Sequence, residues 1–210
     1  MKKLVVGNWK MHGTRASNAE LLQGLLSADL PTTAPRADVA VCAPFVYLAD
    51  VAAALAGSAI AYGSQDVSCQ KQGAYTGEVS GAMLKEFGVK YAIVGHSERR
   101  SYHAESNQLV ADKAKTALAE GLTPVVCVGE TLAEREANQT EFVVAAQLKA
   151  VIDTLGEQLS SIVVAYEPVW AIGTGKTASP EQAQAVHALL RKQLAAATVH
   201  ADRVPLLYGG

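Results

Sequence analysis

The chain has 210 residues and a formal net charge of −2, and half of its residues are apolar. This length and composition predict a single domain, residues 1–210, with one sizeable core. The balanced charge argues against nucleic-acid or anionic-membrane partners, and no apolar run approaches the roughly 20 residues that a membrane span needs.

Seven short runs of apolar and β-branched residues predict strands. Each run is nearly continuous rather than alternating, which is typical of strands buried on both faces of a parallel sheet. In chain order the runs are residues 4–6, 39–42, 59–62, 91–94, 124–128, 162–165 and 204–207.

Helical patterns lie between these strands. Ser17, with Glu20 three positions later, predicts a capping box ahead of a leucine-rich helix. An apolar stripe over residues 144–155 predicts a second helix, which Gly156 ends. The run Ser-Pro-Glu-Gln at 179–182 combines an N-cap, a first-position proline and a capping-box partner ahead of a third helix.

Strands that alternate with helices predict right-handed β-α-β units, in either a doubly wound open sheet or a (β/α)8 barrel. Polar residues follow several of the strands, and this favours the barrel, whose active site lies at the carboxyl ends of all its strands. A doubly wound sheet would concentrate them at one switch point. These residues are Asn8, Lys10, Gln65, His96, Glu98, Glu130 and Glu167.

The strand count is one short of a barrel. The sequence ends at Gly210, directly after the seventh strand, whereas an eighth strand is needed to close the sheet. Without it the first and seventh strands have unpaired edges. We therefore expect a (β/α)8 barrel that is truncated at its C-terminus.

The segment 165–177, Ala-Tyr-Glu-Pro-Val-Trp-Ala-Ile-Gly-Thr-Gly-Lys-Thr, is the most informative part of the chain. It places Glu167 at the end of a buried strand, followed by proline and a loop of small residues. A rigid carboxylate beside a mobile cover suits a general base in proton abstraction. A solvated salt bridge is the structural alternative for such a glutamate.

Two other strand ends offer complementary groups. His96 lies where a strand gives way to a short helix, whose dipole disfavours the imidazolium, so a neutral ring can donate to a carbonyl oxygen. Lys10 follows the first strand as a fixed cation suited to a phosphate or an enolate oxygen. A packed histidine and an ordinary surface lysine are the alternatives.

Other motifs carry less weight. Cys127 lies inside an apolar strand, where burial raises the pKa of a thiol, so a structural role is favoured over a nucleophilic one. Gly175-Lys176-Thr177 resembles the end of a P-loop, but Trp170 stands where that motif needs glycine. The glycines at 173 and 175 mimic a dinucleotide fingerprint without its later acidic residue. The five histidines lack paired ligand spacing, so no metal site is expected.

The three cysteines are widely spaced, odd in number and without a CxxC pair. This pattern favours a reducing compartment, and only three apolar residues separate Lys3 from Gly7, too few for a signal peptide. We therefore expect a cytoplasmic protein.

Five segments together resemble the triosephosphate isomerase family, in family order and spacing: residues 7–11, 73–80, 94–100, 127–136 and 165–177. The resemblance implies a (β/α)8 barrel and an aldose–ketose isomerase of glycolysis and gluconeogenesis. Such an enzyme interconverts dihydroxyacetone phosphate and D-glyceraldehyde 3-phosphate through an enediolate, with no cofactor or metal.

The resemblance also implies residue roles. Glu167 matches the family's catalytic base and His96 its neutral electrophile, while Lys10 and Asn8 match the groups that hold substrate and stabilise the enediolate. Glu98 and Cys127 match supporting positions beside the site.

Residues 168–177 resemble the family's lid, in which Gly173 donates a backbone N–H to the substrate phosphate. Gly210 matches a further phosphate-binding position. The family pattern continues beyond it with more phosphate-binding N–H donors, so the 210-residue chain alone is expected to bind substrate poorly. The segment 65–79 resembles the loop through which the family forms homodimers, with Thr76 reaching toward the partner's site.

Three alternatives remain open. In the first alternative, the chain is a catalytically impaired barrel that serves as a scaffold or assembly component. In the second, it is another phosphosugar enzyme on the same fold, such as an aldolase that works through Lys10. A nucleotide-binding module is the third, and the failed motifs disfavour it.

Overall fold

The computed structural model describes residues 3–28, 37–175 and 177–209, and these contain one sheet of seven strands. All neighbouring strands are parallel and pair in chain order. The strands are β1 (Lys3–Asn8), β2 (Ala37–Cys42), β3 (Ala61–Ser64), β4 (Tyr91–Val94), β5 (Thr123–Val128), β6 (Val163–Tyr166) and β7 (Leu206–Tyr208).

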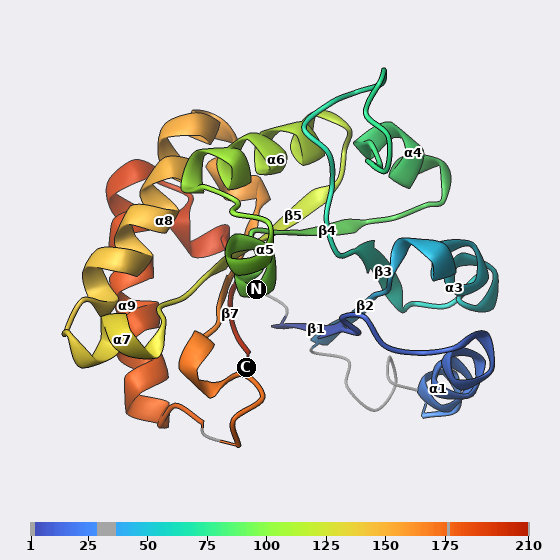
Figure 1. Ribbon diagram of the computed structural model, residues 1–210, viewed down its shortest axis with the longest axis horizontal. Helices are drawn as coiled ribbons and strands as arrows, with labels where there is room; N and C mark the ends of the chain where they lie inside the picture. Colours follow the sequence, from blue (N-terminus) through green and yellow to red (C-terminus); the bar gives the residue numbers. More distant parts are fainter. Residues whose placement is uncertain (1–2, 29–36, 176, 210) are drawn as a thin grey trace.

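Helices connect the strands and lie around the outside of the sheet (Figure 1). The α-helices are α1 (Arg15–Ser27), α3 (Leu48–Ala54), α4 (Gly81–Glu86), α5 (Ser97–Tyr102), α6 (Asn107–Ala119), α7 (Leu132–Glu136), α8 (Thr140–Leu155) and α9 (Pro180–Ala197). Short 3-10 segments are η1 (Phe45–Tyr47), η2 (Gly156–Ser161), η3 (Val169–Ala171) and η4 (Ala201–Arg203). Within the described residues, none of these helices has the length and apolar character of a membrane span.

The sheet has a core on each face. Its concave side buries side chains such as Ile93, Val125 and Val163, and its outer side packs on the helices through residues such as Leu148 and Leu190. Both faces of the central strands β4, β5 and β6 are buried, which explains their continuous apolar runs in the sequence, whereas the edge strands β1 and β7 stay partly exposed.

The strands β1 and β7 face each other across a cleft of about 560 Å³. Leu4 and Val6 line it from β1, and Leu206 and Leu207 from β7. The two strands are not paired within the described part of the chain. The sheet is thus a nearly closed barrel, which confirms the predicted fold class and rules out the reordered strands of a doubly wound sheet.

The third strand lies two residues later in the chain than predicted. The sequence predicted residues 59–62, whereas β3 ends with Gly63 and Ser64. A Cβ atom at Gly63 would lie 2.6 Å from Sγ of Cys42 and 2.7 Å from the carbonyl oxygen of Tyr91. Glycine here allows close packing between strands instead of ending the strand.

The predicted cap of the first helix is wrong. The helix α1 begins at Arg15, Thr14 is its N-cap, and Ser17 completes the capping box in place of Glu20. Serine is able to fill the third helical position, N3, because its hydroxyl oxygen accepts a hydrogen bond from the N-cap backbone N–H.

The caps of two later helices are confirmed. The helix α9 has Ser179 as N-cap, proline in its first turn and Gln182 as capping-box partner. The helix α8 ends at Gly156, whose φ of 52° lies in the left-handed region that glycine adopts without strain.

Candidate active site

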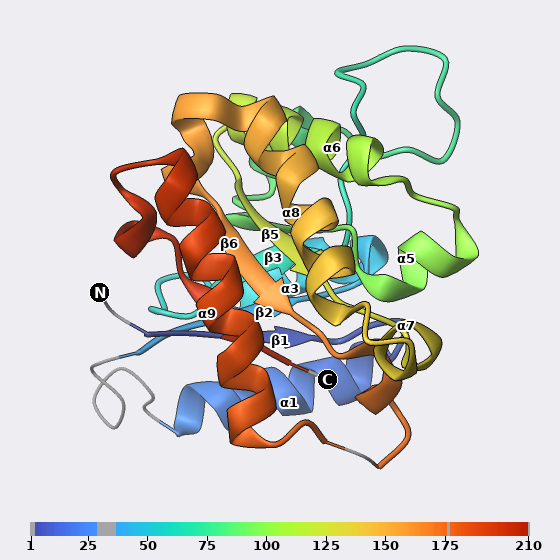
Figure 2. The same cartoon turned by 90° about the vertical axis from the view of Figure 1, so that its left-hand side faces the viewer.

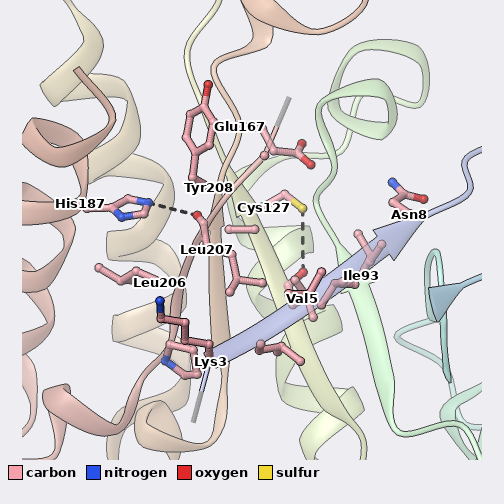
Figure 3. Close-up of a pocket in the computed structure, with 16 residues that line it drawn as sticks. Lys3, Val5, Asn8, Ile93, Cys127, Glu167, His187, Leu206, Leu207 and Tyr208 are labelled. Atoms are coloured by element: carbon pink, nitrogen blue, oxygen red, sulfur yellow. Dashed lines mark hydrogen bonds between the residues drawn. The ribbon is translucent and has the colours of Figure 1, made fainter. Parts of the chain in front are cut away.

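The carboxyl ends of the strands bring the predicted catalytic side chains to one rim of the barrel. Asn8 ends β1, Lys10 follows it, His96 follows β4, and Glu167 follows β6. Figure 3 shows Asn8 and Glu167 near one end of the cleft between β1 and β7. Parallel strands paired in chain order produce this clustering because all their carboxyl ends point the same way.

The closest catalytic pair is Glu167 and His96. Oε2 of Glu167 lies 3.3 Å from Nε2 of His96, and the two side chains are 16% and 5% exposed. Oε2 of Glu167 is buried and has no hydrogen-bond partner among the described residues. This carboxylate oxygen is therefore free to receive a proton.

The protonation of the His96 ring follows from its other nitrogen. Nδ1 of His96 accepts the backbone N–H of Glu98 at 3.2 Å, so the ring proton of the neutral form lies on Nε2. His96 is also the N-cap of α5. In that tautomer the Nε2–H lies on the side of the ring nearest Oε2 of Glu167, 3.3 Å away.

Lys10 is held at three points. Its Nζ donates to Oε1 of Glu98 at 2.7 Å, its backbone N–H donates to Oδ1 of Asn8 at 3.0 Å, and its carbonyl accepts from Nε2 of Gln65 at 2.8 Å. Its φ of 52° lies in the left-handed region, which is costly for a lysine. These hydrogen bonds offset that cost and fix the cation at the rim.

Two adjoining cavities hold these groups. Lys10 and His96 line one of about 470 Å³, and Glu167 lines the cleft of about 560 Å³. Asn8 lines both. The base therefore approaches this space from one side and the cation from the other, as a small substrate between them requires.

Cys127 lies in β5 with its side chain on the concave face of the sheet (Figure 3). It is 3% exposed, and burial raises its pKa well above the ordinary thiol value. A buried thiol that stays protonated fits the structural role that the sequence predicted.

Trp170, within the predicted lid of residues 168–177, is anchored to a buried carboxylate. Nε1 of Trp170 donates to Oε1 of Glu130 at 2.9 Å, and the Arg135 guanidinium lies 4.5 Å from the ring centre of Trp170. Tyr166 and Arg135 also donate to Oε1 of Glu130. The sequence placed Glu130 among the polar groups of the rim, but the fully buried side chain anchors the lid instead.

The far end of the lid is joined to the last strand. The backbone N–H of Ala178 donates to the hydroxyl of Tyr208 at 3.2 Å. Gly173, between the two anchors, is exposed and has a φ of 68°. The role of Tyr208 was not predictable, because no local signal links a tyrosine of β7 to a residue 30 positions earlier in the chain.

Two further predicted site residues are not tested by the structure. Thr76 is exposed in the protruding middle part of the loop of residues 65–79 (Figure 2). Gly210 lies outside the described residues, as does Lys176 of the predicted lid. Their proposed roles stay predictions.

Comparison with known proteins identifies the family. The sequence model of the family described as triosephosphate isomerase matches residues 3–210. Proteins named triosephosphate isomerase from Paracidovorax citrulli, Delftia acidovorans and Bordetella pertussis are 64%, 63% and 58% identical to this chain. The alignments cover 100%, 100% and 99% of the chain, and 83%, 84% and 82% of those proteins. The chain therefore belongs to the triosephosphate isomerase family.

Proposed function

We propose that this chain interconverts dihydroxyacetone phosphate and D-glyceraldehyde 3-phosphate, the isomerisation that links the two trioses in glycolysis and gluconeogenesis. Glu167 takes a proton from one substrate carbon and returns it to the next, while the Nε2–H of His96 polarises the carbonyl oxygen. The observation that carries this proposal is the 3.3 Å separation between the unpartnered Oε2 of Glu167 and Nε2 of His96.

The remaining groups supply charge and shielding. Proton removal creates an enediolate, and the Lys10 ammonium and the Asn8 amide lie at the rim where they stabilise its negative charge. The lid of residues 168–177 excludes water from the site. Without water, the enediolate phosphate is protected from the elimination of phosphate to which it is prone.

Isomerisation in D₂O tests the proposal. A single carboxylate that exchanges its proton with solvent predicts product with deuterium at the carbon that receives the proton. Product formed without any deuterium would argue against transfer through an exchangeable carboxylate. A chain with no turnover at all would instead favour the scaffold interpretation.

The aldolase alternative needs Lys10 as an uncharged nucleophile. Its Nζ instead lies 2.7 Å from Oε1 of Glu98, an ion pair that has to break before the amine can attack a carbonyl. Borohydride treatment in the presence of triose phosphate is therefore expected to leave Lys10 unmodified. A trapped adduct on this residue would support the aldolase.

We also propose that two copies of the chain form a homodimer through residues 65–79. Residues 70–78 of this loop are exposed, and segments that follow strands β1, β2 and β4 expose apolar side chains, with Met11 94%, Val46 80% and Tyr102 80% exposed. Large apolar side chains left exposed are typical of an interaction surface. The partner's loop would bring its tip, near Thr76, to the cavity beside Lys10. Light scattering at micromolar concentration tests this, and a monomeric mass would contradict it.

A cytoplasmic location is the last part of the proposal. Cys42, Cys69 and Cys127 are free thiols in the structure, as expected for a protein of a reducing compartment. Fractionation of the native cells tests it.

A further inference from the structure

Four charged side chains form a closed ring beside the active-site rim. Nζ of Lys113 lies 2.7 and 2.9 Å from the two carboxylate oxygens of Asp66 and 2.6 Å from Oε1 of Glu105. Arg99 closes the ring, with Nε 2.7 Å from Oε1 of Glu105 and NH2 2.8 Å from Oδ2 of Asp66. Two cations and two anions thus alternate around it.

The ring is largely removed from water. The side chains of Lys113, Asp66 and Glu105 are 6%, 10% and 2% exposed, whereas Arg99 is 28% exposed. Burial raises the pKa of Asp66, while for Glu105 the hydrogen bonds and charges of Lys113 and Arg99 outweigh burial and lower its pKa. Apolar residues would often fill such a space at equal or lower cost, so stability alone is a weak reason for four buried charges.

The ring adjoins two of the three residues that hold Lys10. Gln65, which binds the carbonyl of Lys10, directly precedes Asp66 in the chain. Glu98, which binds Nζ of Lys10, directly precedes Arg99. The contact between Asp66 and Arg99 therefore ties together the backbone and side-chain anchors of one cation.

We propose that the ring of Asp66, Arg99, Glu105 and Lys113 is a positioning device that fixes the Lys10 ammonium at the active-site rim. Lys113 and Glu105 hold Asp66 and Arg99 from α6 and from the segment after α5, so the two anchors of Lys10 cannot move apart independently. The inference rests on the proposed role of Lys10 but concerns residues that do not touch the substrate.

The catalytic test is a double-mutant cycle between the ring and an anchor. We expect Asp66→Asn to lower kcat/KM about tenfold through misplacement of Lys10. Combined with Glu98→Gln, it should lower kcat/KM by less than about twofold beyond Glu98→Gln alone, because both changes release the same cation. The matched control is Lys149→Met with Asp153→Asn, an exposed pair at 2.6 Å on α8, which should leave kcat/KM unchanged.

A second measurement does not depend on activity. Acylation of lysines by an amine-reactive ester, followed by mass spectrometry, reports the freedom of each Nζ. In Asp66→Asn we expect Lys10 to react several-fold faster than in the parent, with Lys192 as the internal reference. Inactivity of the parent would refute the proposed function, yet this measurement would still decide the role of the ring.

Folding of the variants is checked by thermal unfolding. If Asp66→Asn does not fold, Asp66→Asn with Lys113→Met removes one charge of each sign and keeps the ring balanced, and the same results are expected of it. An unchanged acylation rate at Lys10 would overturn the proposal. The proposal would also be overturned if the losses of kcat/KM in Asp66→Asn and Glu98→Gln multiplied in the double variant. Independent losses would mean that the ring supports the fold without acting through Lys10.

Discussion

Oε2 of Glu167 and Nε2 of His96 lie 3.3 Å apart although the two residues follow different strands. The backbone explains the placement of the base, because the N–H of Glu167 donates to the carbonyl of Val128 at 2.8 Å. This bond extends the pairing of β5 with β6 beyond the strand end, so the carboxylate is carried by the rigid part of the barrel.

Replacement of Glu167 by glutamine removes the base and keeps the shape of the side chain. We expect kcat to fall by about 10²–10⁴-fold or more, the usual contribution of a general base. A coupled assay of triose isomerisation measures the change, and the unfolding midpoint should stay close to that of the parent. Turnover within about tenfold of the parent would exclude Glu167 as the base.

Gly129 leaves room for the backbone of Glu167. A Cβ atom at position 129 would overlap the carbonyl oxygen of Glu167, and the backbone of Gly129 is fixed by two hydrogen bonds to Gln147, at 2.8 and 3.0 Å. We expect Gly129→Ala to displace the base and lower kcat/KM by about 10²-fold, the effect of a displacement near 1 Å.

The matched control for this substitution is Gly24→Ala. Gly24 lies inside α1 with nothing within 4 Å of an added Cβ, so alanine should stabilise the protein by about 0.5–1 kcal/mol and leave activity unchanged. Chemical denaturation and steady-state kinetics measure both variants. Normal kcat/KM in Gly129→Ala would show that the base tolerates the displacement.

Trp170 anchors the lid to the buried carboxylate of Glu130. We expect Trp170→Phe, which removes the donor at 2.9 Å, to loosen the lid and lower kcat/KM several-fold to about 30-fold. Limited proteolysis should cut the lid faster. Tyr166→Phe removes another donor to the same oxygen without changing the lid, so an equal loss of activity in both variants would attribute the effect to Glu130 itself.

The thiols differ in reactivity because of burial. Burial raises the pKa of Cys42 to about 12, so at pH 8 only about one molecule in 10⁴ carries this thiolate. Burial also raises the pKa of Cys127, so its thiolate is scarce as well, whereas Cys69 is half-buried. We expect a maleimide to modify native protein first at Cys69, at a rate that rises with pH because thiolate is the reacting form.

The Cys69→Ser variant checks this assignment. It should abolish the fast labelling of native protein and leave the two slow sites, whose reaction requires opening of the barrel. Rapid labelling of Cys127 in mass spectra would show that the concave core is accessible to solvent.

Several parts of the site were predictable because their signals are local. The continuous apolar runs predicted parallel strands buried on both faces, and Glu167, His96 and Lys10 stand directly after such runs. Parallel strands then place these residues at one rim. The third strand was misplaced because Gly63 resembles a turn residue, whereas its small size serves the contact with Tyr91.

The sequence by itself determined the strands, the C-terminal end of α8, the N-cap of α9 and the strand-end positions of the catalytic groups, because each depends on residues close together in the chain. Only the tertiary structure decided the partners of the charges. Asp66 and Lys113 are 47 residues apart, and Glu130 and Trp170 are 40 apart. No periodicity predicts such a contact, since it depends on how the barrel curls and which side chains it excludes from water.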